Sequence, residues 1–314
     1  MKRLKTILIC VGLSLSATVL TGCWADDELP VAEDPATPAP VLNLTQDGTV
    51  HAFAFNGYEP LAAKPVNVSY FIPASGDPAQ MPILFIFPGE ERDADSHVRL
   101  FTDWANANGV MLFGLSFSTA YYSTTTEYIL GGMNTRQSAV GLLPSEQWNF
   151  NYVETLFEAI TSSLSGSQTT YDIWGHSAGA QYVHRFVTFM PQAHVRKAVA
   201  CNSGWYSVPD LAVEFPYGLG QVSEANTGMQ QTALARQLSV CIGQNDTSTD
   251  GLNDNTGSVA QGQNRNERGR YYYNRAQQIA QQSGYSFRWT LREVANTAHD
   301  ATGMARGTMD LLLP

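Results

Sequence analysis

Basic residues are scarce in this chain. Lys and Arg together number 18 against 28 Asp and Glu, which gives a formal net charge of −10. Lys2, Arg3 and Lys5 lie at the very start, so the chain from residue 23 onward carries a formal charge of −13. Such an excess of negative charge disfavours binding to nucleic acids, to other polyanions, or to membranes through a broad basic surface. We therefore expect no nucleic-acid partner.

Cysteine is also scarce, with four residues in 314. Cys201 and Cys241 each lie near the end of a short apolar run that is typical of a strand. In an oxidising compartment the two thiols can pair if their strands are neighbours. Bridging neighbouring parallel strands demands unusual geometry, however, so we expect two buried free thiols.

The N-terminal apolar run, from Ile7 to Leu20, is too short for a membrane-spanning helix. It follows the basic residues, as in an export signal peptide. The end of the run, Val19-Leu20-Thr21-Gly22-Cys23, resembles a bacterial lipobox. This resemblance implies removal of residues 1–22 and lipidation of Cys23; an ordinary signal peptide is the alternative. Trp24 stands where an aspartate would resemble an inner-membrane retention signal, so we expect a lipid-anchored envelope protein of the outer membrane.

Residues 23–45 form a segment that cannot build a core. Proline, alanine and acidic residues dominate it, with Pro30, Pro35, Pro38 and Pro40 close together. This composition predicts a stiff tether between the lipid and the rest of the chain. Residues 46–314 are long enough for one large domain.

Beyond the tether, strand patterns alternate with helix patterns. The expected strands are 51–55, 66–73, 82–87, 110–117, 170–174, 195–201, 238–243 and 287–294. The expected helices are 93–108, 151–164, 180–190, 267–282 and 302–313. Polar stretches at 118–148 and 202–229 interrupt the alternation and are expected to be irregular. The pattern predicts an α/β fold with a mostly parallel sheet and helices on both faces.

The stretch Gly175-His176-Ser177-Ala178-Gly179 lies between an expected strand and an expected helix. A G-x-S-x-G sequence in this position is typical of the nucleophile elbow of the α/β-hydrolase fold. The turn is so tight that side chains two residues before and after the serine would collide with their neighbours. It also places the serine hydroxyl at a helix N-terminus, which favours developing negative charge. The pattern therefore predicts Ser177 as a nucleophile.

A serine hydroxyl needs a neighbouring base that is oriented by a carboxylate. In this fold the three residues follow one another as serine, acid and histidine. His299 lies after the last expected strand and is the predicted base. Asp246, three residues beyond strand 238–243, is the predicted acid, and Asp210 and Asp250 remain alternatives.

Two backbone N–H groups are expected to hold the oxyanion, those of Ala178 and of Glu90 in the loop after strand 82–87. This chemistry requires no metal or organic cofactor, and none is expected. The loop 246–254 places carboxylates at the first, fifth and ninth positions of an EF-hand-like loop. Its twelfth position is Gly257, so calcium binding is only a minor hypothesis.

Further motifs surround the elbow and recur later in the chain: Trp174-Gly175-His176-Ser177-Ala178-Gly179-Ala180-Gln181, Asn202-Ser203-Gly204-Trp205-Tyr206, Val208-Pro209-Asp210, Phe215-Pro216-Tyr217-Gly218-Leu219, Gln261-Gly262-Gln263-Asn264-Arg265 and Glu267-Arg268-Gly269. With them, most of the chain after residue 50 resembles bacterial depolymerase-like and feruloyl-esterase-like α/β-hydrolases. The resemblance implies hydrolysis of carboxylic esters through an acyl-serine intermediate, and it does not fix the substrate.

Other functions share the same pattern. A carbohydrate esterase that releases acetyl or feruloyl groups, or a serine peptidase, would carry the same three residues. A surface-binding lipoprotein on a hydrolase scaffold without activity is the alternative from another class. Several aromatic residues are candidates to line a substrate pocket: Trp205, Tyr206, Tyr121, Tyr122 and Trp148.

Overall fold

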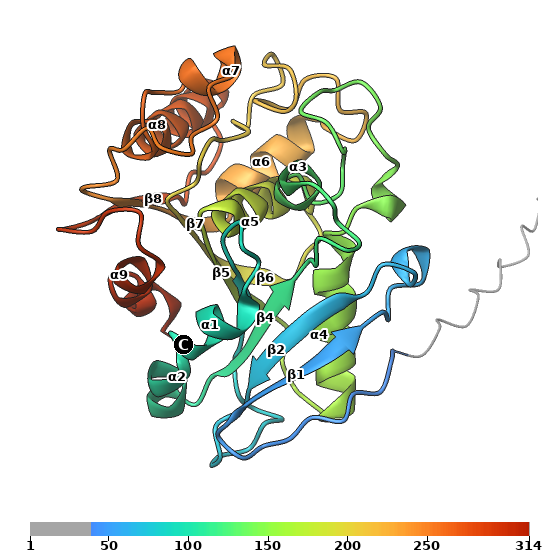
Figure 1. The fold of residues 1–314 in the computed structure, drawn as a ribbon. Helices are drawn as coiled ribbons and strands as arrows, with labels where there is room; N and C mark the ends of the chain where they lie inside the picture. Colours follow the sequence, from blue (N-terminus) through green and yellow to red (C-terminus); the bar gives the residue numbers. More distant parts are fainter. Residues whose placement is uncertain (1–38, 314) are drawn as a thin grey trace, which may run out of the picture. The chain divides into compact units, whose positions relative to one another are not determined.

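The structure is a computed structural model that describes residues 39–313 (Figure 1). The predicted signal peptide, Cys23 and most of the predicted tether lie outside the described residues. The backbone N–H of Leu42 donates to Ser163 Oγ and that of Thr45 to the Tyr70 hydroxyl, so contacts with the domain begin before residue 46. Within residues 39–313, no helix is both long and apolar enough to cross a membrane.

The strands form one eight-stranded sheet with the order β1-β2-β4-β3-β5-β6-β7-β8. Their bounds are β1 Val50–Phe55, β2 Val66–Phe71, β3 Ile83–Phe87, β4 Met111–Ser116, β5 Tyr171–His176, β6 Val195–Cys201, β7 Gln237–Gly243 and β8 Thr290–Val294. β2 runs antiparallel to β1 and to β4, and the pairs from β4 to β8 are parallel. This confirms the predicted mostly parallel sheet and places the carboxyl ends of its parallel strands along one edge.

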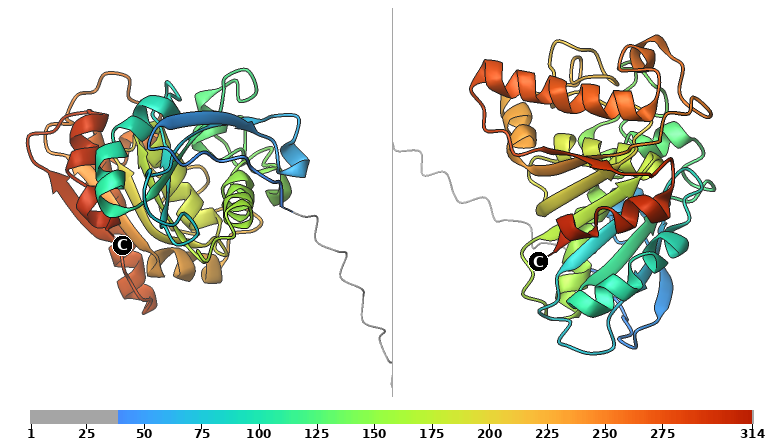
Figure 2. Two further views of the ribbon diagram at one scale, coloured as in Figure 1. Left: turned by 90° about the horizontal axis from the view of Figure 1, so that it is seen from below. Right: turned by 90° about the vertical axis from the view of Figure 1, so that its left-hand side faces the viewer.

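Helices cover both faces of the sheet (Figures 1 and 2). Their bounds are α1 Ala94–Arg99, α2 Thr102–Asn108, α3 Thr125–Ile129, α4 Asn151–Ser163, α5 Ala178–Phe189, α6 Thr227–Ala235, α7 Thr256–Val259, α8 Arg265–Ser283 and α9 Ala301–Arg306, with short 3₁₀ turns at Glu59–Leu61, Ser145–Gln147 and Met309–Leu312. Side chains alternate between two cores, as strand geometry requires. In β3, Phe85 packs with α4 and α5 in the larger core, whereas Leu84 and Ile86 pack with α1, α2 and α9 in the smaller one.

Two predicted helices are interrupted. Helix 93–108 is divided into α1 and α2, because the N–H groups of Leu100 and Phe101 bond three residues back instead of four. The tighter turn lets the buried Phe101 ring pack edge-on against Trp174, 5.0 Å away. Helix 302–313 is broken near Thr308, whose hydroxyl donates to the Met304 carbonyl and accepts from Trp174 Nε1.

The two long polar stretches are less irregular than expected. Stretch 118–148 contains α3, and α6 begins within 202–229. Asn226 starts α6 by accepting a hydrogen bond from the backbone N–H of Met229. Its buried face contains a glutamine, Gln230, and a small alanine, Ala233, beside Met229 and Leu234. The amphipathic pattern is therefore weak, and periodicity missed the helix.

The two internal cysteines are neighbours in the sheet. Cys201 in β6 and Cys241 in β7 are register partners, and both thiols are buried and free, as expected. Burial raises the pKa of the Cys241 thiol well above its ordinary value.

Two histidines, His176 and His184, are buried, and a third, His97, is half-buried. His184 in α5 faces the Ala180 carbonyl through Nδ1, and its Nε2 accepts from the backbone N–H of Ser207, so Nδ1 carries the proton. Burial lowers the pKa of His97, His176 and His184 below the ordinary 6.5.

These imidazoles predict loss of stability in mild acid. Below about pH 6.5 the unfolded chain binds protons that the folded chain excludes, so the free energy of unfolding falls as pH falls. Each histidine contributes up to about 1.4 kcal/mol per pH unit in that range. Melting temperatures measured from pH 7.5 to 5.0 should decline, with a shallower decline for His184→Asn than for the parent chain. A melting temperature that is flat between pH 7 and 5.5 would contradict this account.

Candidate active site

The elbow is a sharp turn between β5 and α5. Ser177 adopts φ 55° and ψ −115°, an unfavourable conformation for a non-glycine residue, and its N–H donates to the Cys201 carbonyl at 2.9 Å. A Cβ on Gly175 would lie 2.4 Å from the Gly179 carbonyl oxygen, and one on Gly179 would lie 2.0 Å from the Phe87 oxygen. Both glycines are therefore required by the close approach of the neighbouring backbone.

Three predicted residues meet at this turn. His299 Nε2 lies 3.0 Å from Ser177 Oγ, and His299 Nδ1 lies 2.8 Å from Asp246 Oδ2. The rival acids lie elsewhere: Asp210 pairs with Arg275 at 2.5 Å, and Asp250 is exposed. The Asp246 side chain is 1% exposed, so its carboxylate faces the imidazole away from bulk water.

Asn202, directly after β6, ties together the loops that carry the acid and the base. Its side-chain oxygen accepts from the Gly243 N–H at 2.7 Å, just before Asp246, and its side-chain nitrogen donates to the Ala298 carbonyl at 3.1 Å, just before His299. Asn202 is completely buried and has φ 54°, a left-handed conformation that asparagine tolerates better than most residues. One side chain thus fixes the spacing between the two loops.

The loop after β3 passes directly beside the nucleophile. A Cβ on Gly89 would lie 3.8 Å from the Ser177 Cβ, and Glu90 lines the same cavity as Ser177 and Ala178. The Tyr128 hydroxyl donates to the Pro88 carbonyl at 2.8 Å and holds this loop from the α3 side. Glu90 and Ala178 are therefore on the two segments that border the serine.

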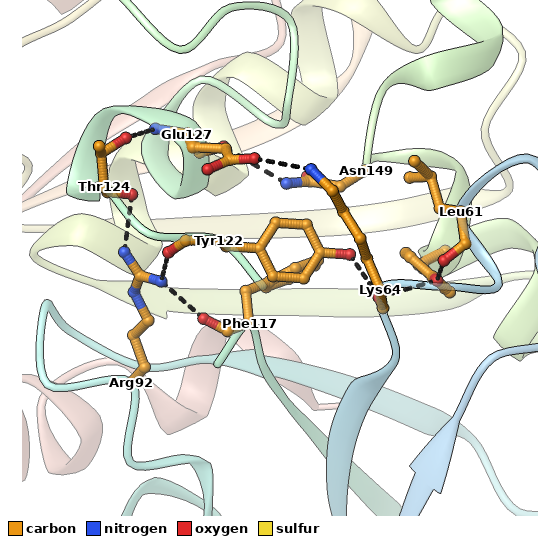
Figure 3. Close-up of polar contacts among 9 residues, drawn as sticks. Leu61, Lys64, Arg92, Phe117, Tyr122, Thr124, Glu127 and Asn149 are labelled. Atoms are coloured by element: carbon orange, nitrogen blue, oxygen red, sulfur yellow. Dashed lines mark hydrogen bonds and ion pairs between the residues drawn. The ribbon is translucent and has the colours of Figure 1, made fainter. Parts of the chain in front are cut away.

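Arg92 fastens the polar stretch 118–148 to this loop (Figure 3). Its guanidinium donates to the carbonyl oxygens of Phe117, Tyr122 and Thr124, which lead into α3. Beside it, Lys64 Nζ lies 3.1 Å from Glu127 Oε1. The wall of the site on this side is thus held by a buried arginine and backbone carbonyls.

Ser177 opens into a cavity of about 360 Å³. Trp205 lines it as predicted, and the Arg185 guanidinium stacks 4.0 Å from the centre of the Trp205 ring. The other four predicted pocket residues do not line it. Tyr206 is buried and stacks on Tyr272 in the core, with 4.4 Å between the ring centres.

Tyr121 is also absent from the cavity, because it lies on the surface with 44% of its area exposed. Tyr122 points away from Ser177 and hydrogen-bonds the Lys64 carbonyl. Trp148 borders a different and larger hollow of about 630 Å³ near the C-terminal end of α5, whose lining includes neither Ser177 nor His299.

His176 lies next to His299, the predicted base. Its ring centre is 4.7 Å from that of His299, and burial, reinforced by the nearby His299, holds its pKa well below 6.5. A neutral ring in this position keeps a second cation away from His299 when that residue takes up a proton.

The minor calcium hypothesis for the loop 246–254 is not supported by its side chains. Asp246 faces His299 and lies 3.6 Å from Arg265 Nη1. Residues 39–313 contain no cluster of three histidine, cysteine or acidic side chains able to hold a metal ion.

Comparison with solved structures identifies the family. Poly(aspartic acid) hydrolase-1 from Sphingomonas sp. KT-1 is 30% identical to this chain, with a TM-score of 0.79 over 84% of this chain and 98% of that one. The chain belongs to the same α/β-hydrolase family as this enzyme. It also has the fold of the poly(3-hydroxybutyrate) depolymerase from Bordetella parapertussis, with 24% identity and a TM-score of 0.78 over 85% of this chain and 91% of that one.

More distant structures share the architecture alone. An S-formylglutathione hydrolase from Agrobacterium tumefaciens has 13% identity and a TM-score of 0.52 over 87% of this chain and 98% of that chain. Neither a protein-family model nor a curated protein sequence matches the chain. The comparisons establish the protein as a hydrolase with the α/β-hydrolase fold.

Two residues that the structure brings near Ser177 were given no site role from the sequence. Asn202 stood only within a family motif, because its role depends on two loops that are distant in sequence. Arg265 lines the cavity and begins α8. A cation at a helix N-terminus is unfavourable because it lies at the positive end of the helix dipole. Residues that conflict with such local preferences are often functional, and this conflict is the sequence signal that could have identified Arg265.

Asn202→Gly is predicted to impair the site without straining the backbone, since glycine adopts φ 54° readily. Loss of both side-chain hydrogen bonds should lower kcat about 10- to 100-fold through misplacement of His299 and Asp246, and lower the free energy of unfolding by about 1–3 kcal/mol.

Steady-state kinetics and urea unfolding test this prediction. Asn296→Gly is the matched control, because Asn296 also has a positive φ of 55° but is exposed. Equal effects of the two variants on kcat would refute the role of Asn202.

Proposed function

We propose that the protein hydrolyses esters through an acyl-serine intermediate formed on Ser177. The observation that carries this proposal is the continuous hydrogen-bonded line from Ser177 Oγ through His299 to the buried Asp246 carboxylate. In this arrangement His299 Nε2 takes the serine proton as Oγ attacks the ester carbonyl. Asp246 holds Nδ1–H, keeps the productive tautomer and stabilises the imidazolium.

The tetrahedral intermediate places a negative oxygen between the elbow and the β3 loop. We assign the N–H groups of Ala178 and Glu90 as its donors, supported by the position of both residues on the wall of the Ser177 cavity. His299 then passes its proton to the departing alcohol, and the acyl group remains on Ser177. In the second half, His299 takes a proton from water, the resulting hydroxide equivalent attacks the acyl-serine, and the proton returns to Ser177 as the carboxylic acid leaves.

Ser177→Ala is predicted to lower kcat for 4-nitrophenyl acetate or butyrate by roughly 10³- to 10⁶-fold, because the covalent route is lost. The protein comprising residues 39–314 is to be compared with its Ser177→Ala variant. Ser223→Ala is the control, because it removes an exposed serine outside the cavity. A fluorophosphonate should label the parent protein and Ser223→Ala, and it should not label Ser177→Ala. Undiminished turnover in Ser177→Ala would refute the proposal.

We further propose that the enzyme is anchored in the bacterial outer membrane by lipid on Cys23, after removal of residues 1–22. Support comes from the basic start, the short apolar run and the lipobox-like Val19-Leu20-Thr21-Gly22-Cys23. Two or more acyl chains, at about 0.8 kcal/mol per buried methylene, suffice for stable anchoring.

The full chain expressed in a bacterial host should incorporate an alkyne-tagged fatty acid and partition into detergent. Cys23→Ala should lose the tag, because its thiol is the acceptor, whereas Cys10→Ala should keep it. Equal tagging of Cys23→Ala and the parent chain would exclude the anchor.

A further inference from the structure

Arg265 is a buried arginine whose guanidinium makes no hydrogen bond with any residue in 39–313. It is 8% exposed, its Nε is buried without a partner, and its nearest charged group is Asp246 Oδ1, 3.6 Å from Nη1. A guanidinium carries five N–H donors, and burying any of them unpaired is costly. Asp246 Oδ1, which also has no hydrogen bond, pairs with Nη1 only at 3.6 Å, so the donors of Arg265 remain largely unsatisfied within the described residues.

The other buried arginines around the site show how unusual this is. The guanidinium of Arg268, one turn further along α8, donates to three carbonyl oxygens. Arg92 also donates to three carbonyls, and Arg185 donates to two carbonyls and a serine hydroxyl. These three arginines fasten loops together. Arg265 holds no loop in the described structure, so a purely structural role does not account for it.

Arg265 also lies on the wall of the cavity that contains Ser177. This cavity of about 360 Å³ is lined by Ala178 as well. Arg265 is the first residue of the 19-residue helix α8, where the helix dipole adds positive potential instead of offsetting the cation. The side-chain oxygen of Gln181, on the same wall, is buried without a partner as well. The cavity therefore contains polar groups that await a polar ligand, not a surface suited to a long acyl chain.

One carboxylate lines the cavity, and a second lies behind its wall. Glu90 lines it and accepts a hydrogen bond from the Thr125 hydroxyl at 2.6 Å, whereas the buried Asp246 is engaged by His299. Together with the formal charge of −13 from residue 23 onward, they oppose a highly charged polyanion. A single carboxylate fits the planar fork of one guanidinium.

We propose that Arg265 is a specificity residue that binds one carboxylate of the substrate, so that the preferred substrates are esters with a single free carboxylate near the scissile bond. This proposal rests on the proposed function, since it assumes that Ser177 is the nucleophile of the same cavity. A charge-assisted bidentate contact should raise kcat/KM for a carboxylate-bearing ester roughly 10- to 100-fold over its uncharged counterpart.

Matched ester pairs test the proposal on either side of the scissile bond. For the acyl side, 4-nitrophenyl hydrogen adipate is compared with its methyl ester; for the alcohol side, 4-acetoxybenzoate is compared with its methyl ester. Rates with Ser177→Ala are subtracted to remove spontaneous hydrolysis. Arg265→Gln is compared with Arg270→Gln, which makes the same change at an exposed position of α8 that pairs with Glu293.

We expect a preference for the charged member of at least one pair in the parent enzyme and in Arg270→Gln, and its loss in Arg265→Gln, where kcat/KM falls about 10- to 100-fold further for the charged ester than for the uncharged one. Absence of preference in the parent would overturn the proposal. An equal loss for charged and uncharged esters in a folded Arg265→Gln would also overturn it, because Arg265 would then act through Asp246 alone. Failure of the parent to hydrolyse any ester or to react with a fluorophosphonate would instead refute the proposed function.

Discussion

The close packing of three backbone segments at the end of β5 is the constraint on which the site depends. The first turn of α5 lies so near the end of β3 that Gly179 has no room for a side chain. The same contact holds Ser177 in an unfavourable conformation with its hydroxyl turned outward. Because β3 ends next to the first turn of α5, the loop that follows β3 lies beside Ser177. The nucleophile and the proposed oxyanion donors are thus positioned by the sheet itself.

The remaining residues reach the serine from loops that the sheet only approximately aligns. Parallel strands place the ends of β7 and β8 on the same edge as β5, and side chains complete the alignment. Asn202 joins the acid loop to the base loop, and Arg92 joins the β3 loop to the stretch before α3. The two contacts lie at opposite flanks of the serine in the sheet order, after β6 and after β3. The strand order therefore brings the loops near Ser177, and the side chains of Asn202 and Arg92 fix their positions.

Much of this architecture could be predicted from local sequence pattern. Apolar runs bounded by glycines predicted the strands, and the two glycines beside Ser177 predicted the turn. The predictions that were wrong concerned features that depend on contacts between residues distant in sequence. The break at Phe101 follows from packing against Trp174, and the separate places of Trp205, in the cavity wall, and Tyr206, in the core, follow from which neighbour each ring meets. Asp246 could be predicted as the acid because it follows closely after a strand. The positions of Asn202 and Arg265 beside the site could be recognised only in the folded structure.

The hydrogen bonds that join Arg92 to the stretch before α3 are not ion pairs. The three partners of Arg92 are carbonyl oxygens, which do not take up protons, and an arginine stays charged at any ordinary pH even where burial lowers its pKa. A wall held by carboxylates would loosen as they become protonated, whereas these bonds persist. Two carboxylate contacts on the same flank, Lys64 with Glu127 and Thr125 with Glu90, are sensitive to acid in a way that the bonds of Arg92 are not. Acid should therefore loosen this flank first at α3, while Arg92 still joins Thr124 to the β3 loop.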